Sequence, residues 1–203
     1  MRTSAIATII AAAIVAASPA AHALELTPAQ TEGPYYPQQK PLETDTDLTR
    51  IGDGPVAKGD VLSLKGRVLD PTGAPIPGAR VEIWQTDHQG IYLHPGDNRT
   101  AQRDKTFQFY GETRSAENGA FEFRTIVPAL YPGRPRHIHA KITPPGGATL
   151  TTQFYFKGDA GLERDGIARR LGKALESVTL SPKPTGNAPS GPLEATVDVV
   201  VKK

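Results

Sequence analysis

Residues 61–85 read VLSLKGRVLDPTGAPIPGARVEIWQ, and this stretch decides the fold class. At its start, the apolar residues Leu62, Leu64 and Val68 alternate with polar ones, which is the period of a strand with one buried face. Pro and Gly crowd the middle and indicate a turn. Residues 80–85 then resume the alternating pattern. The stretch therefore predicts two short strands joined by a turn.

The rest of the chain shows the same pattern of short strands separated by turns. The further segments with a strand pattern are Ala120–Ile126, His137–Ile142, Leu150–Phe156 and Leu193–Val201. Only Gly166–Leu175 is a helix candidate, and 19 Pro and 20 Gly residues supply turns. Short strands without a repeated βα unit predict an all-β fold. We expect an antiparallel β-sandwich or barrel-like core with long loops and at most one short helix.

The first residues have the pattern of an export signal. Arg2 precedes an apolar run over residues 5–17, and Ala21-His22-Ala23 is a small-x-small cleavage site. The run is shorter than the roughly 20 residues of a membrane-spanning helix, so a retained anchor is the weaker alternative. We expect residues 1–23 to be a signal peptide and residues 24–203 to be one domain, periplasmic or secreted, without a membrane anchor.

Charge and composition narrow the possible partners. The chain has 23 basic and 21 acidic residues, so no strong field points to nucleic acid or to an anionic membrane. It has no Cys, which removes disulfides, thiolate metal sites and cysteine nucleophiles. A metal site in this chain would therefore need His, carboxylate or Tyr ligands.

The segment YPGRPRHIH, residues 131–139, carries the strongest local signal of chemistry. In a strand His137 and His139 project from the same face and can reach one metal ion, but two surface histidines would look the same. The upstream Tyr131 could supply a phenolate, a hard donor that favours Fe(III), or could be an ordinary buried aromatic. Tyr92 and His94 follow another predicted strand, and either could be a ligand or a plain loop residue.

Taken together, the motifs resemble the intradiol ring-cleavage dioxygenase family, in particular its protocatechuate 3,4-dioxygenase beta chains. The resemblance runs from about Glu32 to the last strand. The matching pieces are EGPYY at 32–36, DLTRI at 47–51, GRVLD at 66–70, PGARVEIWQ at 77–85, TIVP at 125–128, YP at 131–132, RP at 134–135, HIH at 137–139, TQFYF at 152–156 and GD at 158–159.

The resemblance implies one non-haem Fe(III) per chain. Its ligands would be Tyr92, Tyr131, His137 and His139, with Tyr131 leaving the metal to accept a proton from the substrate. The substrates would be a small aromatic diol and O2, and the ring would open between the two hydroxyl-bearing carbons to a cis,cis-muconate-type diacid. The diol itself and any homo-oligomer stay open.

The resemblance also assigns roles around the metal. Arg134 would stabilise charge that develops on the ring. Gln153 would support the metal ligands without binding the metal, and Tyr35 would lie at the mouth of the site. Arg136 departs from the small residue usual in the family. It is either an exposed arginine or a rim cation that favours a ring bearing a carboxylate.

Two other classes of function compete with the dioxygenase. A transthyretin-like module on the same scaffold would only bind or hold other proteins, and a zinc or copper hydrolase would use the His pair. The hydrolase lacks a carboxylate ligand within ten residues of that pair. The binding module has no need of four ligand-type residues. The sequence therefore favours the dioxygenase.

Overall fold

A computed structural model describes residues 23–186 and 191–202 of the chain. The predicted signal peptide lies outside these residues, apart from Ala23. Among the described residues, no helix combines the length and the apolar composition needed to cross a membrane.

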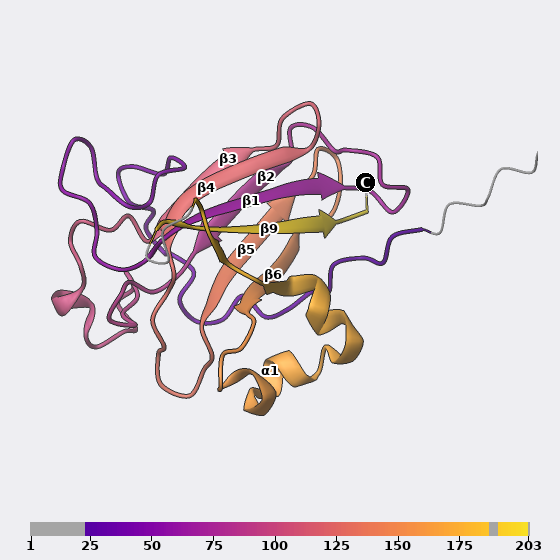
Figure 1. Cartoon of the computed structure of the whole chain (residues 1–203). Coiled ribbons are helices and arrows are strands. Elements are labelled where there is room, and N and C mark those ends of the chain that lie inside the picture. Colours follow the sequence, from indigo (N-terminus) through magenta and orange to yellow (C-terminus); the bar gives the residue numbers. More distant parts are fainter. Residues whose placement is uncertain (1–22, 187–190, 203) are drawn as a thin grey trace, which may run out of the picture.

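Two β-sheets make up the fold, with long loops gathered at the left of the view in Figure 1. One sheet has the strand order β4-β1-β9-β8 and the other β3-β2-β5-β6-β7. The strands are β1 (Val61–Leu69), β2 (Arg80–Trp84), β3 (Tyr110–Arg114), β4 (Ala120–Ile126), β5 (His137–Thr143), β6 (Leu150–Phe156), β7 (Thr179–Leu180), β8 (Lys183–Pro184) and β9 (Leu193–Val200).

Helical structure is scarce and short. The α-helix α1 spans Gly166–Arg169 and lies beyond the end of β6 (Figure 1). Three 3-10 helices span Thr100–Gln102, Leu162–Arg164 and Gly172–Val178. The predicted helix is thus a single α-helical turn followed by a 3-10 segment.

The core lies between the sheets and follows the alternation read from the sequence. Leu62, Leu64 and Val68 of β1 are fully buried, and Ile138 and Ile142 of β5 face them from the other sheet's side of the core. Burying one such side chain contributes about 1.5–3 kcal/mol. The all-β sandwich is therefore confirmed, while strand pairs join the two sheets nowhere among the described residues and barrel-like closure is not seen there.

The expectation of a wholly antiparallel fold is wrong in two places. β9 pairs with β1 in parallel, and β7 pairs with β6 in parallel. β9 returns to the first sheet after the chain has built most of the second sheet, so it enters in the direction of β1. Alternation within one strand gives its buried face and carries no information on the direction of its partner.

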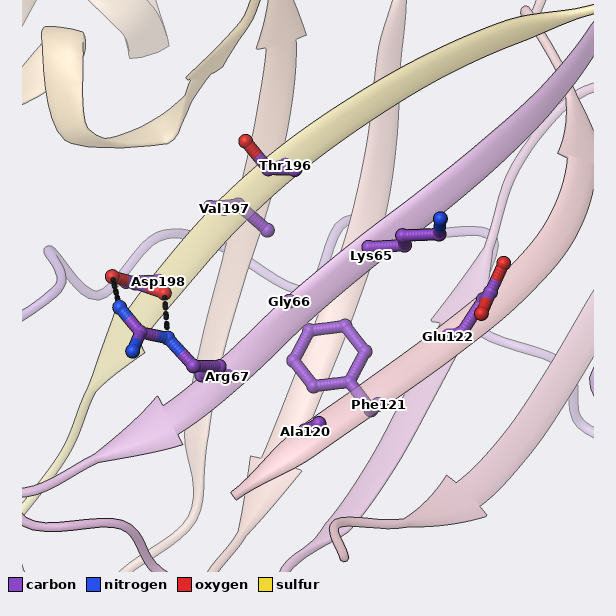
Figure 2. Close-up of a pocket in the computed structure, with 9 residues that line it drawn as sticks. All are labelled: Lys65, Gly66, Arg67, Ala120, Phe121, Glu122, Thr196, Val197 and Asp198. Carbon is purple, nitrogen blue, oxygen red and sulfur yellow. Dashed lines mark hydrogen bonds and ion pairs between the residues drawn. The ribbon is translucent and has the colours of Figure 1, made fainter. Parts of the chain in front are cut away.

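The outer face of the four-stranded sheet is open and charged (Figure 2). Arg67 of β1 donates to both carboxylate oxygens of Asp198 on β9, and Lys65 pairs with Glu194 at 2.6 Å. Gly66 between them leaves room for Phe121 of the neighbouring strand. This face has the exposed, cross-strand ion pairs of an ordinary solvated sheet.

Candidate metal centre

The candidate site lies on the outer face of the five-stranded sheet. His137 and His139 project to this face, because Ile138 between them faces the core. Strand register places Trp84 of β2 and Gln153 of β6 on either side of His139. The predicted His pair on one strand face is thus where the alternation put it, and side chains from three adjacent strands surround it.

Three potential donor atoms converge at this pair. Nε2 of His137 and Nε2 of His139 are 3.2 Å apart, and Oη of Tyr92 lies 3.3 Å from the first and 3.2 Å from the second. Atoms spaced in this way all lie about 2 Å from a common point, which is the length of a metal–imidazole bond. All three side chains are at most 4% exposed. The arrangement fits a bound metal ion.

The loop after β2 brings Tyr92 to the pair. Asp97 accepts a hydrogen bond from the backbone N–H of Tyr92 at 3.0 Å, and the hydroxyl of Thr100 donates to the carbonyl of Tyr92 at 3.0 Å. His94, the other candidate on this loop, turns its Nδ1 to the backbone N–H of Gly96. Of the two residues that the sequence left open, the structure therefore places Tyr92 at the histidines.

Tyr131 and Tyr35 complete the aromatic surround. The ring centroid of Tyr131 is 5.7 Å from that of Tyr92 and 6.0 Å from that of His137. Tyr35 stacks on Tyr92 with centroids 4.6 Å apart and meets Tyr131 edge-on at 5.7 Å. Tyr131 is less buried than Tyr92. All four predicted ligands are thus neighbours, and Tyr35 forms a wall beside them.

Burial sets the protonation of these groups. It lowers the pKa of His137 to about 4, helped by the charge of Arg134, and lowers the pKa of His139 well below its usual range. Both imidazoles are therefore neutral near pH 7. Nδ1 of His137 lies 2.7 Å from the carbonyl of Pro135 and must donate to it, which leaves the lone pair on Nε2.

The pKa of the Tyr92 phenol shifts in the opposite direction. Burial raises the pKa of Tyr92, so its hydroxyl is protonated unless a nearby cation stabilises the phenolate. Within residues 23–186 and 191–202, no three His, Cys, Asp or Glu side chains gather as a metal site. The third donor at the His pair is a phenol oxygen, which suits a hard, highly charged ion.

Arg134 is held rigidly beside this centre. Its Nε donates to Asp165 at 2.6 Å and its Nη2 donates to Oε1 of Gln153 at 2.8 Å. Burial alone would lower the pKa of Arg134, but the hydrogen bond to Asp165 and the charge of that carboxylate together raise it. Gln153 is itself fixed, because its Nε2 donates to the carbonyl of Thr31 at 2.9 Å. The predicted arginine and glutamine therefore act as one hydrogen-bonded unit.

Arg136 lies at the edge of the site. Its side chain is 42% exposed and its Nη1 is 3.4 Å from Asp159. It lines an open cleft of about 690 Å³ together with Tyr131, Arg134 and Arg164. This position matches a rim cation and is also compatible with an exposed arginine.

Two residues at the site were missed by sequence reasoning. Trp84 stacks flat on His139, with ring centroids 4.7 Å apart and planes 8° apart. Asp165 holds Arg134 and also caps α1 by accepting from Ile167 N and Ala168 N. The Asp-Gly at the start of the predicted helix signals a cap. Nothing local signals a pairing across 31 residues.

Comparisons with known proteins identify the family of the chain. The model of the Dioxygenase family matches residues 31–203. The chain is 31% identical to a hydroxyquinol 1,2-dioxygenase of Nocardioides simplex, over 83% of this chain and 61% of the relative. It is 35% identical to a protocatechuate 3,4-dioxygenase beta chain of Burkholderia cepacia, over 70% of this chain and 63% of the relative. The chain thus spans less than two thirds of these relatives.

A solved structure is similar over nearly its whole length. It is the dioxygenase domain of a dioxygenase–carbohydrate-binding protein fusion from Streptomyces sp. SirexAA-E. The two share 33% identity and a TM-score of 0.67, covering 87% of this chain and 98% of that one. The described fold therefore matches nearly the whole of that dioxygenase domain.

Proposed function

The chain belongs to the intradiol ring-cleavage dioxygenase family, and on that premise we propose that it opens a catechol-type ring between its two hydroxyl-bearing carbons. The co-substrate is O2, the cofactor is one non-haem Fe(III) per chain, and the product is a cis,cis-muconate-type diacid. The chain covers only part of its curated relatives, so their activities support this proposal as analogies.

The observation that carries the proposal is the convergence of Tyr92, His137 and His139 on one point, with Tyr131 adjacent. Bound there, ferric iron would supply a Lewis acid that makes the diol acidic and draws electron density from its ring. The two neutral imidazoles and the Tyr92 phenolate would hold the ion. Tyr131, the least buried of the four, would be the donor that can give way to the diol and accept its proton.

The remaining residues bind and orient the ring. Arg134 presents a fixed guanidinium, which stabilises negative charge as it develops without having to reorganise. Tyr35 offers an aromatic wall for the substrate ring. Arg136 on the rim favours a ring that carries a carboxylate, because a guanidinium fork matches that group.

Oxygen uptake with a panel of diols tests this function. Catechol, protocatechuate and hydroxyquinol are supplied in turn, and products are identified by mass and ultraviolet absorption. We expect O2 and the diol to be consumed one to one and the product to contain both oxygen atoms. If the iron-loaded protein consumes no O2 with any of these diols, the proposal is wrong and the transthyretin-like binding module is favoured.

Export is a separate proposal. The basic start, the apolar run and the small-x-small site at Ala21–Ala23 favour a mature N-terminus at Leu24, outside the cytoplasm. Mass spectrometry of the protein from its native host measures this directly. An intact chain from Met1 to Lys203 in the cytoplasm would contradict the proposal.

A further inference from the structure

The two histidines of the site are held in different ways. Nδ1 of His137 donates to the carbonyl of Pro135 at 2.7 Å. Nδ1 of His139 is buried and has no hydrogen-bond partner among the described residues. Metal-binding histidines usually have their second nitrogen hydrogen-bonded, which fixes the ring. No hydrogen bond from the described residues therefore orients the ring of His139.

Packing takes that role. The indole of Trp84 lies flat against the imidazole of His139, at 4.7 Å and 8°. Gly33 approaches the same ring so closely that a Cβ there would stand 3.3 Å from Cε1 of His139. The imidazole is thus confined by an aromatic plane and by a backbone segment, and its orientation depends on both staying in place.

Trp84 is itself fixed only by its neighbours. Its Nε1 is buried without a hydrogen-bond partner among the described residues. Tyr36 meets the indole edge-on, with centroids 4.9 Å apart and planes 88° apart. The hydroxyl of Tyr36 donates to Oε1 of Glu82 at 2.8 Å. Since Glu82 lies two residues before Trp84 on β2, the carboxylate and the indole share one face of the strand.

Glu82 is a fully buried acid outside the proposed chemistry. Its side chain is 0% exposed, and a buried carboxylate is unfavourable unless it is hydrogen-bonded and paired. Burial alone would raise its pKa, but hydrogen bonds from Tyr110 and Tyr36 lower it, so Glu82 is ionised at neutral pH. Tyr110 donates to Oε1 at 2.6 Å, and Lys40 and Arg80 lie 3.4 Å and 3.2 Å from the carboxylate.

Tyr36 also belongs to the segment that covers the metal centre. Tyr35 next to it stacks on Tyr92, and a Cβ at Gly33 would crowd His139. Lys141 of β5 lies 3.6 Å above the Tyr36 ring and pairs with Glu32, which ties the same segment to the strand that carries the histidines. The hydrogen bond from Tyr36 to Glu82 joins these contacts and links the segment to the strand that carries Trp84.

We propose that Glu82 is a positioning residue for the metal centre, which orients His139 through Tyr36 and Trp84. It touches neither the metal nor the substrate. The inference rests on the proposed function, because it takes His139 as a ligand. Its experimental signature is a change in how the protein holds its metal, separate from any change in fold stability.

Two single-hydroxyl deletions test it. Tyr36→Phe and Tyr110→Phe each remove one hydrogen bond to the same oxygen of Glu82. Tyr36 stands in the segment that covers the metal centre and meets the indole of Trp84 edge-on, whereas Tyr110 lies on β3, opposite Trp84 in the sheet. The readouts on the iron-loaded full chain are the tyrosinate-to-iron absorption band and the rate at which a chelator removes iron. Circular dichroism and urea unfolding report the fold.

We expect Tyr36→Phe to shift the band and to speed iron loss about tenfold, which is the usual effect of losing a partner behind a metal ligand. Tyr110→Phe also removes the contact of this hydroxyl with Glu112, so it should lower stability at least as much, but it should leave both metal readouts unchanged. Trp84→Leu should change both metal readouts more than Tyr36→Phe does. Trp84→Phe, which keeps an aromatic ring, should change them less than either of these substitutions.

The outcomes separate the two proposals. If the unsubstituted chain holds iron and shows the band, but Tyr36→Phe and Tyr110→Phe leave both unchanged or change both equally, Glu82 is only a structural acid and the inference is overturned. If the unsubstituted chain binds no iron and shows no band, the proposed function fails and the inference fails with it.

Discussion

The outer face of the four-stranded sheet is open to solvent, whereas that of the five-stranded sheet is buried under loops and the segment around Tyr35. On the open face, Arg67 is 56% exposed and pairs with Asp198 (Figure 2). On the covered face, His137 and His139 are 4% and 3% exposed. Both faces arise from the same alternation of apolar and polar residues along a strand.

The chemistry of an outer sheet face therefore depends on whether loops bury it or leave it in solvent. Charged pairs in water interact weakly and tolerate change. On the buried face, the same alternation along the strand places the two histidines together. The covering loops bring the Tyr92 phenol to them, and the fixed guanidinium of Arg134 lies beside them. Substitutions on the two faces should therefore differ in the property they alter, which is function on one and stability on the other.

The largest effect is expected at the three converging donor atoms of Tyr92, His137 and His139. His139→Ala removes one of three converging donors, and we expect retention of iron and turnover to fall by more than about a hundredfold, beyond the effect of losing an indirect partner. Lys65→Ala on the open face should leave both unchanged. Iron is measured by elemental analysis and turnover by oxygen uptake. Equal iron content in the two variants would remove His139 from the ligand set.

Arg134→Ala should come next. Removing a fixed charge that stabilises the transition state lowers kcat about 10²–10³-fold, while iron content stays normal because Arg134 is not a donor. Arg67→Ala deletes an arginine from the open face and serves as the matched control. Steady-state kinetics with several diols gives kcat for each. Intact turnover in Arg134→Ala would show that the guanidinium has no part in the chemistry.

Gly66→Ala probes the open sheet for stability alone. A Cβ at Gly66 would lie 2.7 Å from the carbonyl of Val197 and closer still to the ring of Phe121. We expect the free energy of unfolding to fall by about 1–3 kcal/mol, with kcat of the folded enzyme unchanged. Gly166→Ala is the control, since its Cβ would meet open space. Urea unfolding compares them, and equal stabilities would refute the packing argument.

The smallest effect is expected at Arg136, which is on the rim and 42% exposed. Arg136→Ala should shift the ratio of protocatechuate to catechol turnover toward catechol by at most about fivefold, since an exposed ion pair contributes no more than about 1 kcal/mol. Competition assays with both diols measure the ratio. An equal change for both substrates, or none, would identify Arg136 as an ordinary surface arginine.

Much of this layout could be predicted from local pattern. β4 and β6 have the predicted bounds, because a turn signal precedes each of them, Asn118-Gly119 before β4 and Gly146-Gly147 before β6. β3 was missed, because Tyr-Gly-Glu-Thr-Arg has no apolar alternation and its Gly111 serves a close approach to Asp45 and Leu48. The two-residue strands β7 and β8 are too short to leave any periodic signal.

The candidate site also has features that the sequence predicts and features that only the fold reveals. The His pair on one strand face follows from its spacing of two, whereas the choice of Tyr92 over His94 depends on how a loop is pinned by Asp97. Trp84 and Glu82 act across strands, through pairings that only the register of β2 and β5 reveals. Spacing along the chain predicts contacts within an element, and contacts between elements need the fold.

We propose that a ferric ion binds among Tyr92, Tyr131, His137 and His139. The metal content and the visible absorption spectrum of the purified chain, recorded with and without a diol in the absence of O2, test this proposal. We expect one iron per chain, a red-brown tyrosinate-to-iron band, and a change of that band when the diol is added. A colourless protein with stoichiometric zinc and no iron would contradict it.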